Sequence, residues 1–312
     1  YNFGKNVTSV TIPNSVKNIG DNTFRDWTNL SQVTLGDSLE TIGTAAFQGC
    51  TALESIVIPN SVTSFARDVF HGCSNLASVT LGNSLQTIGG GSFWECTRLD
   101  SIIIPNSVTT IEDRVFEGCT KLSYITLGDS LKTIGDWAFK GCSSFNTVNV
   151  SKLDVFFNEF HFGNAYANPF SKASTLHVNG EEVTELVIPY GVEELNGGFF
   201  YNFGKNVTSV TIPNSVTEIG ENAFKNWTNL AQVTFGESLK AIGDWAFAGC
   251  SALTRIDLPN SLESIGGYAF FICSNLSYIT LGDSLKTIGD WAFNGCSSFN
   301  TVNVSKLDVF FN

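Results

Sequence analysis

Residues 29–51 read NLSQVTLGDSLETIGTAAFQGCT, and the same pattern returns every 23 residues along most of the chain. Units of this length begin at Asn6, Asn29, Ala52, Asn75, Arg98 and Lys121, then at Asn206, Asn229, Ala252 and Asn275, with a partial unit from Ser298. Self-similarity at a fixed period is typical of architectures that grow by stacking one unit on the next. The 312 residues therefore do not require two or three separate globular cores.

Each unit carries two short extended segments. Apolar residues recur at positions 2, 5, 7, 11, 14 and 19, and positions 5 and 7 alternate with polar neighbours, which predicts a strand with one face inward. Pro or Gly at position 8 ends that strand, as at Pro13 and Gly36. A second extended piece, Val16 to Ile19 in the first unit, is expected on the opposite wall. A turn around the phenylalanine of position 19 then leads to the next coil, so that stacked coils share one core.

Residues 144–181 interrupt this pattern. Asn168-Pro169 indicates a turn, and Asn179-Gly180 is a residue pair that favours a tight β-hairpin. The sequence therefore predicts a first array at 1–143, an irregular repeat and insertion at 144–181, and a second array at 182–312. We expect the second array to continue the first as one solenoid.

The charge of the chain narrows the classes of partner. There are 29 acidic and 17 basic residues, a net charge of −12, and an acidic surface repels the phosphates of nucleic acids and anionic lipids. No apolar run approaches the roughly 18–20 residues that a membrane-spanning helix needs. We therefore expect neither nucleic-acid binding nor membrane insertion by these residues.

The repeated pattern L-x-x-V-x-I-P-x-S-V-x-x-I-G-x-x-A-F-x-G-C-T resembles the BspA-like leucine-rich repeats, also described as Treponema-type repeats. It covers nearly the whole chain, and LHVNGEEVTELVIP at 176–189 looks like a spacer of that family. The resemblance implies a mainly β leucine-rich-repeat solenoid of 23-residue coils, with a parallel sheet on one face and little helix. It also implies a surface-exposed or secreted protein, often an adhesin for host proteins, matrix or other cells, with no catalytic residues and no cofactor.

The eight cysteines invite a metal or redox interpretation. They all occupy position 22 of the repeat: Cys50, Cys73, Cys96, Cys119, Cys142, Cys250, Cys273 and Cys296. Paired ligands with the close spacing of a zinc site are absent from the sequence. Trp27 and Trp227 take the same position in other units, so the position accepts a bulky apolar side chain. We expect reduced cysteines buried in the core.

Two other motifs suggest chemistry that their context does not favour. Gly-Asp-Ser-Leu, at 36–39 for example, is the signature of a hydrolase family, but Ser38 and His71 belong to different parts of successive coils. Acidic residues recur at positions 9 and 16, where stacked carboxylates would suit Ca²⁺, but neighbouring coils interrupt both series. The sequence therefore predicts neither an enzyme nor a metal site, and favours solvated turns.

Two surfaces remain as candidates for binding. Outward positions of the first strand carry Tyr124, Arg255 and Tyr278 among small polar residues, which either bind a partner or simply keep the sheet soluble. Aromatic residues recur in the closing turn at positions 17 and 20: Trp94, Trp137, Trp245, Tyr268, Phe271 and Trp291. They either form contact sites or pack on one another between coils.

These observations favour an extracellular or cell-surface binding protein whose repeat surface engages a host or matrix protein, or another cell. The alternative is a structural surface stalk, or a scaffold that assembles end to end through homotypic contacts.

Overall fold

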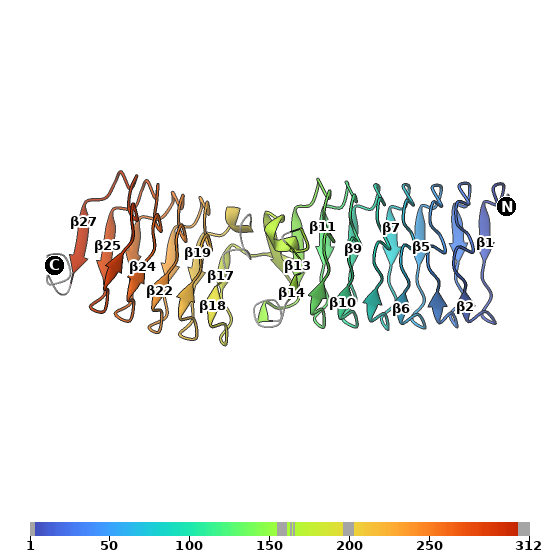
Figure 1. Ribbon diagram of the computed structural model, residues 1–312, viewed down its shortest axis with the longest axis horizontal. Helices are drawn as coiled ribbons and strands as arrows, with labels where there is room; N and C mark the ends of the chain where they lie inside the picture. Colours follow the sequence, from blue (N-terminus) through green and yellow to red (C-terminus); the bar gives the residue numbers. More distant parts are fainter. Residues whose placement is uncertain (1–3, 155–160, 163, 165, 196–202, 305–312) are drawn as a thin grey trace. The chain divides into compact units, whose positions relative to one another are not determined.

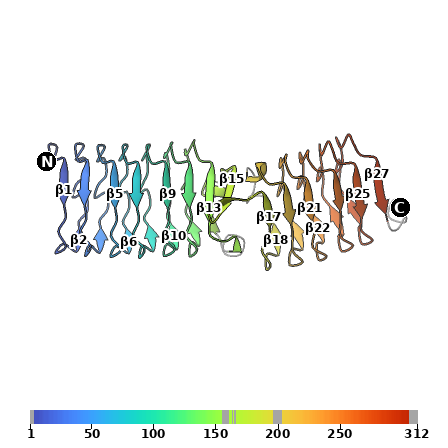
Figure 2. The same ribbon diagram turned by 180° about the vertical axis from the view of Figure 1, so that it is seen from behind.

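The computed structural model describes residues 4–154, 161, 162, 164, 166–195 and 203–304. The protein is mainly β with almost no helix, and most coils contribute one strand to each of two walls. It divides into two compact units, one of Tyr1–Pro169 with His177–Gly180 and the other of Phe170–Leu176 with Glu181–Asn312. Figure 1 shows the successive coils of each unit side by side, and Figure 2 shows them from behind. The predicted β-solenoid is confirmed.

In the first unit, the strands of the first wall occupy positions 4–6 of each coil. They are β1 (Ser9–Thr11), β3 (Gln32–Thr34), β5 (Ser55–Val57), β7 (Ser78–Thr80), β9 (Ser101–Ile103), β11 (Tyr124–Thr126) and β13 (Thr147–Val150). The second wall consists of β2 (Asn18–Ile19), β4 (Thr41–Ile42), β6 (Ser64–Phe65), β8 (Thr87–Ile88), β10 (Thr110–Ile111), β12 (Thr133–Ile134) and β14 (His161–Phe162). Pairing is parallel, with partners 23 residues apart, such as Val10 and Val33, except where Thr133 of β12 meets His161 of β14. Both extended segments predicted for each coil, one on each wall, are therefore present.

The second unit repeats this arrangement. Its first wall contains β17 (Glu185–Val187), β19 (Ser209–Thr211), β21 (Gln232–Thr234), β23 (Arg255–Asp257), β25 (Tyr278–Leu281) and β27 (Thr301–Val304). Its second wall contains β18 (Glu194–Leu195), β20 (Glu218–Ile219), β22 (Ala241–Ile242), β24 (Ser264–Ile265) and β26 (Thr287–Ile288).

Between the arrays, the predicted hairpin is formed by β15 (Thr175–Val178) and β16 (Glu181–Glu182). Its turn residues Asn179 and Gly180 have φ values of 53° and 84°, the positive angles that a tight type I′ turn requires. Two short 3₁₀ turns, Pro169–Ser171 and Phe203–Lys205, complete the regular elements. The continuity of the two arrays as one solenoid stays a prediction.

The core is a column of phenylalanines at position 19. From Phe24 to Phe139, successive rings stack with centroids 5.1 to 5.7 Å apart, and a second column runs from Phe224 to Phe293. Nine of the ten rings are buried, and Phe293 is half-buried. Each ring therefore buries the face of the next, so that neighbouring coils stabilise one another.

Wherever the structure describes the closing turn of a 23-residue coil, two residues lie in the left-handed region of backbone space, at positions 17 and 21. Position 21 is usually Gly, but position 17 includes Ala45, Arg114, Trp137 and Tyr268, all with φ between 54° and 59°. Bulky residues rarely adopt this conformation because their Cβ approaches the backbone closely. The hydrogen bonds between coils hold it in place, as when the amide of Trp245 donates to the carbonyl of Gly267 at 3.0 Å.

The two walls differ in continuity. Second-wall strands β2 to β14 form one seven-stranded sheet, whereas the first-wall sheet is interrupted between β3 and β5, between β7 and β9, and between β21 and β23. At each interruption, a coil with Gly at position 8 precedes a coil with Pro there, as with Gly236 and Pro259. A serine hydroxyl of the Pro coil spans the gap, such as Ser261, which donates to the carbonyl of Leu239 at 2.6 Å. We call these three interruptions open joints.

Candidate binding surfaces

Arg255 and Tyr278, both predicted as contact residues, lie against each other on β23 and β25. The Arg255 guanidinium carbon is 4.2 Å from the centroid of the Tyr278 ring. Its Nε and one terminal nitrogen donate to the two carboxylate oxygens of Asp257 at 2.6 and 2.9 Å. The Thr280 hydroxyl lies 2.8 Å from the same carboxylate. These neighbours hold Arg255 in one orientation although it is exposed to solvent.

The same contacts also determine the ionisation state of Asp257 in this cluster. The hydrogen bond from Arg255 is the largest effect and lowers the pKa of Asp257; desolvation opposes it, and the hydrogen bond from Thr280 adds a smaller lowering. Asp257 therefore stays ionised across the ordinary pH range and keeps Arg255 paired. The cluster presents a fixed cation, a fixed anion and an aromatic ring on the outward face of one sheet.

Tyr124 lies in the first unit, on β11, and is not part of this cluster. Its ring meets the His177 ring edge to face, with centroids 6.0 Å apart. The three strand residues predicted from sequence therefore belong to two different units.

The turn aromatics of the first unit stack with cations. The indole of Trp94 lies parallel to the His71 ring at 4.4 Å. The Arg114 guanidinium is 5.5 Å from Trp94 and 4.4 Å from Trp137. Glu117 holds Arg114 at 3.0 Å. Trp94 and Trp137 are thus joined through a cation that sequence reasoning did not single out.

The turn aromatics of the second unit stack on one another. Lys225 Nζ lies 4.3 Å from the Trp245 ring, Trp245 lies 4.3 Å from Tyr268, and Tyr268 lies 6.4 Å from Trp291. The rings are parallel within 6°, and Phe271 packs edge-on against the first two. These aromatic residues therefore do pack between coils, and they do so through the faces of their rings.

Packing does not cover the whole aromatic surface. The side chain of Trp291 is 60% exposed to solvent. Ile272, a residue of the same series of closing turns, is 50% exposed. Ile272 occupies position 21, where Gly recurs, and its φ is 56°. A β-branched residue in that conformation is strained. Sequence reasoning missed Ile272, and the only signal was an Ile in place of a recurrent Gly.

The outward face of the first wall also exposes aliphatic side chains. Val57 on β5 and Ile103 on β9 are 64% and 67% exposed at the position that threonine usually takes. Each is the last residue of the strand that follows an open joint.

The residues that could have suggested a metal site or a hydrolase have structural roles. All eight cysteines are free and buried, which confirms the predicted core position. His71 contacts Trp94, Gln48 and Glu95. The position-16 carboxylates of Asp21 and Asp244 accept backbone N–H groups of the next coil at 2.7 Å. Turn carboxylates of this kind stabilise the backbone between coils.

Comparison with known proteins agrees with this architecture. The model of the BspA-type leucine-rich repeat region matches residues 1–104, 91–176 and 193–310. A leucine-rich repeat protein from Bacteroides ovatus is 29% identical over 94% of this chain and 86% of that one, with a TM-score of 0.60. A leucine-rich cell-surface protein from Faecalibacterium prausnitzii is also 29% identical, over 96% of this chain and 79% of that one, with a TM-score of 0.47. No match was found among curated protein sequences.

Among the described residues, no helix has the length and apolar character that crossing a bilayer requires. Repeat proteins of this kind typically act as scaffolds without catalysis. Because the family model covers almost all of the sequence and the coils stack as the repeats predict, the chain belongs to the BspA-type leucine-rich repeat family.

Proposed function

We propose that this chain is a surface-exposed or secreted recognition scaffold that binds a protein of a host, of the extracellular matrix or of another cell. The observation that carries the proposal is the set of bulky residues that hold the left-handed turn positions of the second unit: Trp245, Tyr268, Ile272 and Trp291. Gly or Asn at these positions, as at Gly91 and Asn222, adopts the same backbone conformation with less strain.

Strain of this kind persists where the surrounding structure holds it, and it gathers at functional sites. Partly exposed aromatic rings that stack on one another are typical of protein-binding hot spots, which favour Trp and Tyr. The stacked rings lose little conformational freedom on binding because they are already ordered. BspA-type repeats are scaffolds usually found on surface or secreted proteins, which supports this role and favours a non-enzymatic chain.

The charge of the chain adds an expectation about the partner. With a net charge of −12, the scaffold should associate faster with basic surfaces, and raised salt should slow that association.

The test uses residues that the repeat itself offers. The triple variant Tyr268→Gly, Ile272→Gly, Trp291→Asn places at each position a residue found there in another coil. Binding to a panel of purified matrix glycoproteins and collagens would be measured on a biosensor, with thermal unfolding measured in parallel. We expect at least a tenfold loss of affinity, because the variant lacks the side chains that contact the partner. The fold should be retained, because the replacements relieve backbone strain.

A second variant examines the strand residues predicted from sequence. Tyr124→Ser, Arg255→Ser, Tyr278→Ser introduces the serine that β1, β5 and β7 carry at the same position. If only this variant loses binding, the turn surface is not the contact site. If no panel member binds and the chain self-associates in analytical ultracentrifugation, the recognition role is wrong and the structural-scaffold alternative stands.

A further inference from the structure

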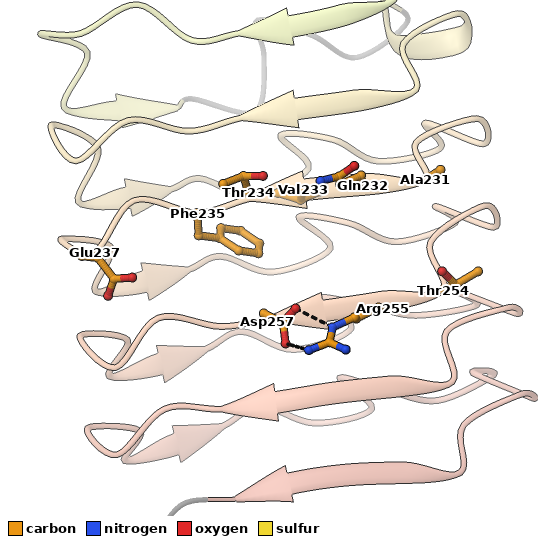
Figure 3. Close-up of a pocket in the computed structure, with 9 residues that line it drawn as sticks. All are labelled: Ala231, Gln232, Val233, Thr234, Phe235, Glu237, Thr254, Arg255 and Asp257. Carbon is orange, nitrogen blue, oxygen red and sulfur yellow. Dashed lines mark hydrogen bonds and ion pairs between the residues drawn. The ribbon is translucent and has the colours of Figure 1, made fainter.

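The open joint between β21 and β23 contains a cavity of about 460 Å³ on the first wall of the second unit. Figure 3 shows the two strands on opposite sides of it, with Gln232 and Thr234 on one side and Arg255 and Asp257 on the other. Glu237 and Thr254 complete the polar lining, and Phe235 contributes the largest apolar side chain. A volume of this size is within the range of small-molecule sites, but its lining is mostly polar.

The backbone edges of the joint add polar groups. Where the sheet is closed, the amide of Tyr278 donates to the carbonyl of Thr254 at 3.3 Å and the amide of Leu258 donates to Thr280 at 3.1 Å. In the described residues of β21 and β23, no such ladder joins the two strands. Edge N–H and C=O groups that no strand partner satisfies are ready to pair with a ligand or water.

Two side chains at the joint, Arg255 and Asp257, are held in place before any ligand arrives. Asp257 holds the guanidinium of Arg255 through two hydrogen bonds, and the Tyr278 ring supports it from the next coil at 4.2 Å. Two carboxylates, Glu237 and Asp257, outweigh the one cation, so an anionic ligand is disfavoured. The site offers both hydrogen-bond donors and hydrogen-bond acceptors within a small cavity.

We propose that the open joint between β21 and β23 binds a neutral saccharide unit. Each sugar hydroxyl both donates and accepts, and therefore matches a lining of carboxylate, guanidinium, amide and hydroxyl groups. The site lies on the strand wall rather than on the turn aromatics, so this inference goes beyond the proposed protein recognition and does not depend on it. Because the cavity is partly open to solvent, affinity for a single sugar is expected in the millimolar range.

The first unit supplies an internal control. Its joint between β3 and β5 has the same Gln-Val-Thr strand, Gln32–Thr34, but Ser55 and Val57 replace Arg255 and Asp257. Ser78 takes the place of Tyr278 on the following strand. The two joints thus share a backbone arrangement. They differ in this cluster and at other positions of the lining, where for example Leu35, Asp37 and Glu54 replace Phe235, Glu237 and Thr254.

The test measures saturation-transfer NMR and calorimetric titration with the methyl glycosides of glucose, galactose, mannose and N-acetylglucosamine, and with methyl glucuronide as the anionic control. We expect at least one neutral glycoside to bind and the glucuronide to bind at least fivefold more weakly. The variant Arg255→Ser, Asp257→Val gives this joint the residues of the first-unit joint at these two positions, and should weaken binding at least tenfold with unfolding unchanged. If that variant does not fold, Arg255→Lys retains the charge, loses the paired hydrogen bonds and should still weaken binding.

A gain of binding is the matching experiment. The variant Ser55→Arg, Val57→Asp, Ser78→Tyr rebuilds the cluster at the first-unit joint and should raise the stoichiometry from one site to two. The inference is overturned if no neutral glycoside binds at about 20 mM, if the double variant binds as well as the parent chain, or if a basic hexapeptide binds at this joint in preference to every glycoside. If the chain binds matrix proteins but no sugar, only the saccharide inference is wrong. If it binds a sugar but no matrix protein, only the proposed function is wrong.

Discussion

The thiol of Cys50 donates a hydrogen bond to the carbonyl oxygen of Phe24, 3.2 Å away in the preceding coil. The same bond joins Cys73 to Phe47 and Cys250 to Phe224, so each cysteine of position 22 attaches its coil to the phenylalanine of the coil before it. A thiol in this position is both a small apolar side chain and a donor to a backbone carbonyl that turns away from the regular sheet. Ionisation would remove the donor and place a charge in the core.

The stability of the chain should therefore fall at alkaline pH. Burial raises the pKa of the Cys50 thiol to about 12, and raises the pKa values of Cys73, Cys96 and Cys119 well above the ordinary value of 9.0. Between pH 9 and pH 12, the thiol of Cys50 is deprotonated in the unfolded chain but keeps its proton in the native chain. The stabilisation by Cys50 is thus complete below pH 9 and is lost as pH rises towards 12, by about 1.4 kcal/mol for each pH unit.

Urea unfolding at pH 7.5, 9.5 and 10.5 measures this loss. The variant Cys50→Ala should be less stable at pH 7.5 and should show a shallower decline above pH 9. Equal slopes for the variant and the parent chain would contradict a buried, protonated Cys50.

Loss of one core phenylalanine should act locally. Phe93 is fully buried, with its ring 5.6 Å from Phe70 and 5.7 Å from Phe116. Phe93→Ala is expected to destabilise its region by about 3–5 kcal/mol through lost burial and the cavity left behind. Hydrogen exchange should accelerate in the neighbouring coils first, because coupling between coils is nearest-neighbour. The control Phe293→Ala, at a half-buried ring, should cost less, and uniform acceleration along the chain would be inconsistent with this fold.

Replacing one exposed isoleucine by glycine should stabilise the protein. Ile272 has a φ of 56° and is half-exposed, so Ile272→Gly removes strain and loses little packing. The expected gain is about 1 kcal/mol, the usual penalty of a left-handed non-glycine residue. Thermal unfolding measures it. The control Ile288→Gly, at an exposed residue of β26, should destabilise by a similar amount because glycine weakens a strand. If both variants destabilise, Ile272 is not strained.

The open joints should appear in amide hydrogen exchange as first-wall strands that exchange faster than their neighbours. Ser78 and Tyr278 follow closed joints, and their amides donate to the preceding coil at 3.3 Å. Ser55 and Arg255 follow open joints, where the first-wall sheet is interrupted. We expect the amides of Ser55 and Arg255 to exchange at least tenfold faster than those of Ser78 and Tyr278. NMR-detected exchange at each residue tests this, and equal protection would mean that the joints are closed in solution.

Much of the fold was predictable because neighbours in a stack of coils are separated by one period. The 23-residue repeat identifies Val10 and Val33 as partners and places the cysteines of position 22 in one column within each array before any coordinate is known. The same reasoning indicated that Tyr268 and Trp291 could pack between coils. It could not show which part of each side chain stays exposed, because exposure depends on the orientation of the ring.

The sequence by itself determined the solenoid, its two walls and the membership of its core, since apolar residues at a fixed spacing can be buried in only one register. The tertiary structure decided which joints open, which turn residues are strained, and how Arg255 meets Tyr278 and Asp257 beside a cavity. These features depend on small differences in how one coil packs against the next. Such differences make or break a hydrogen bond but leave the period of the sequence unchanged.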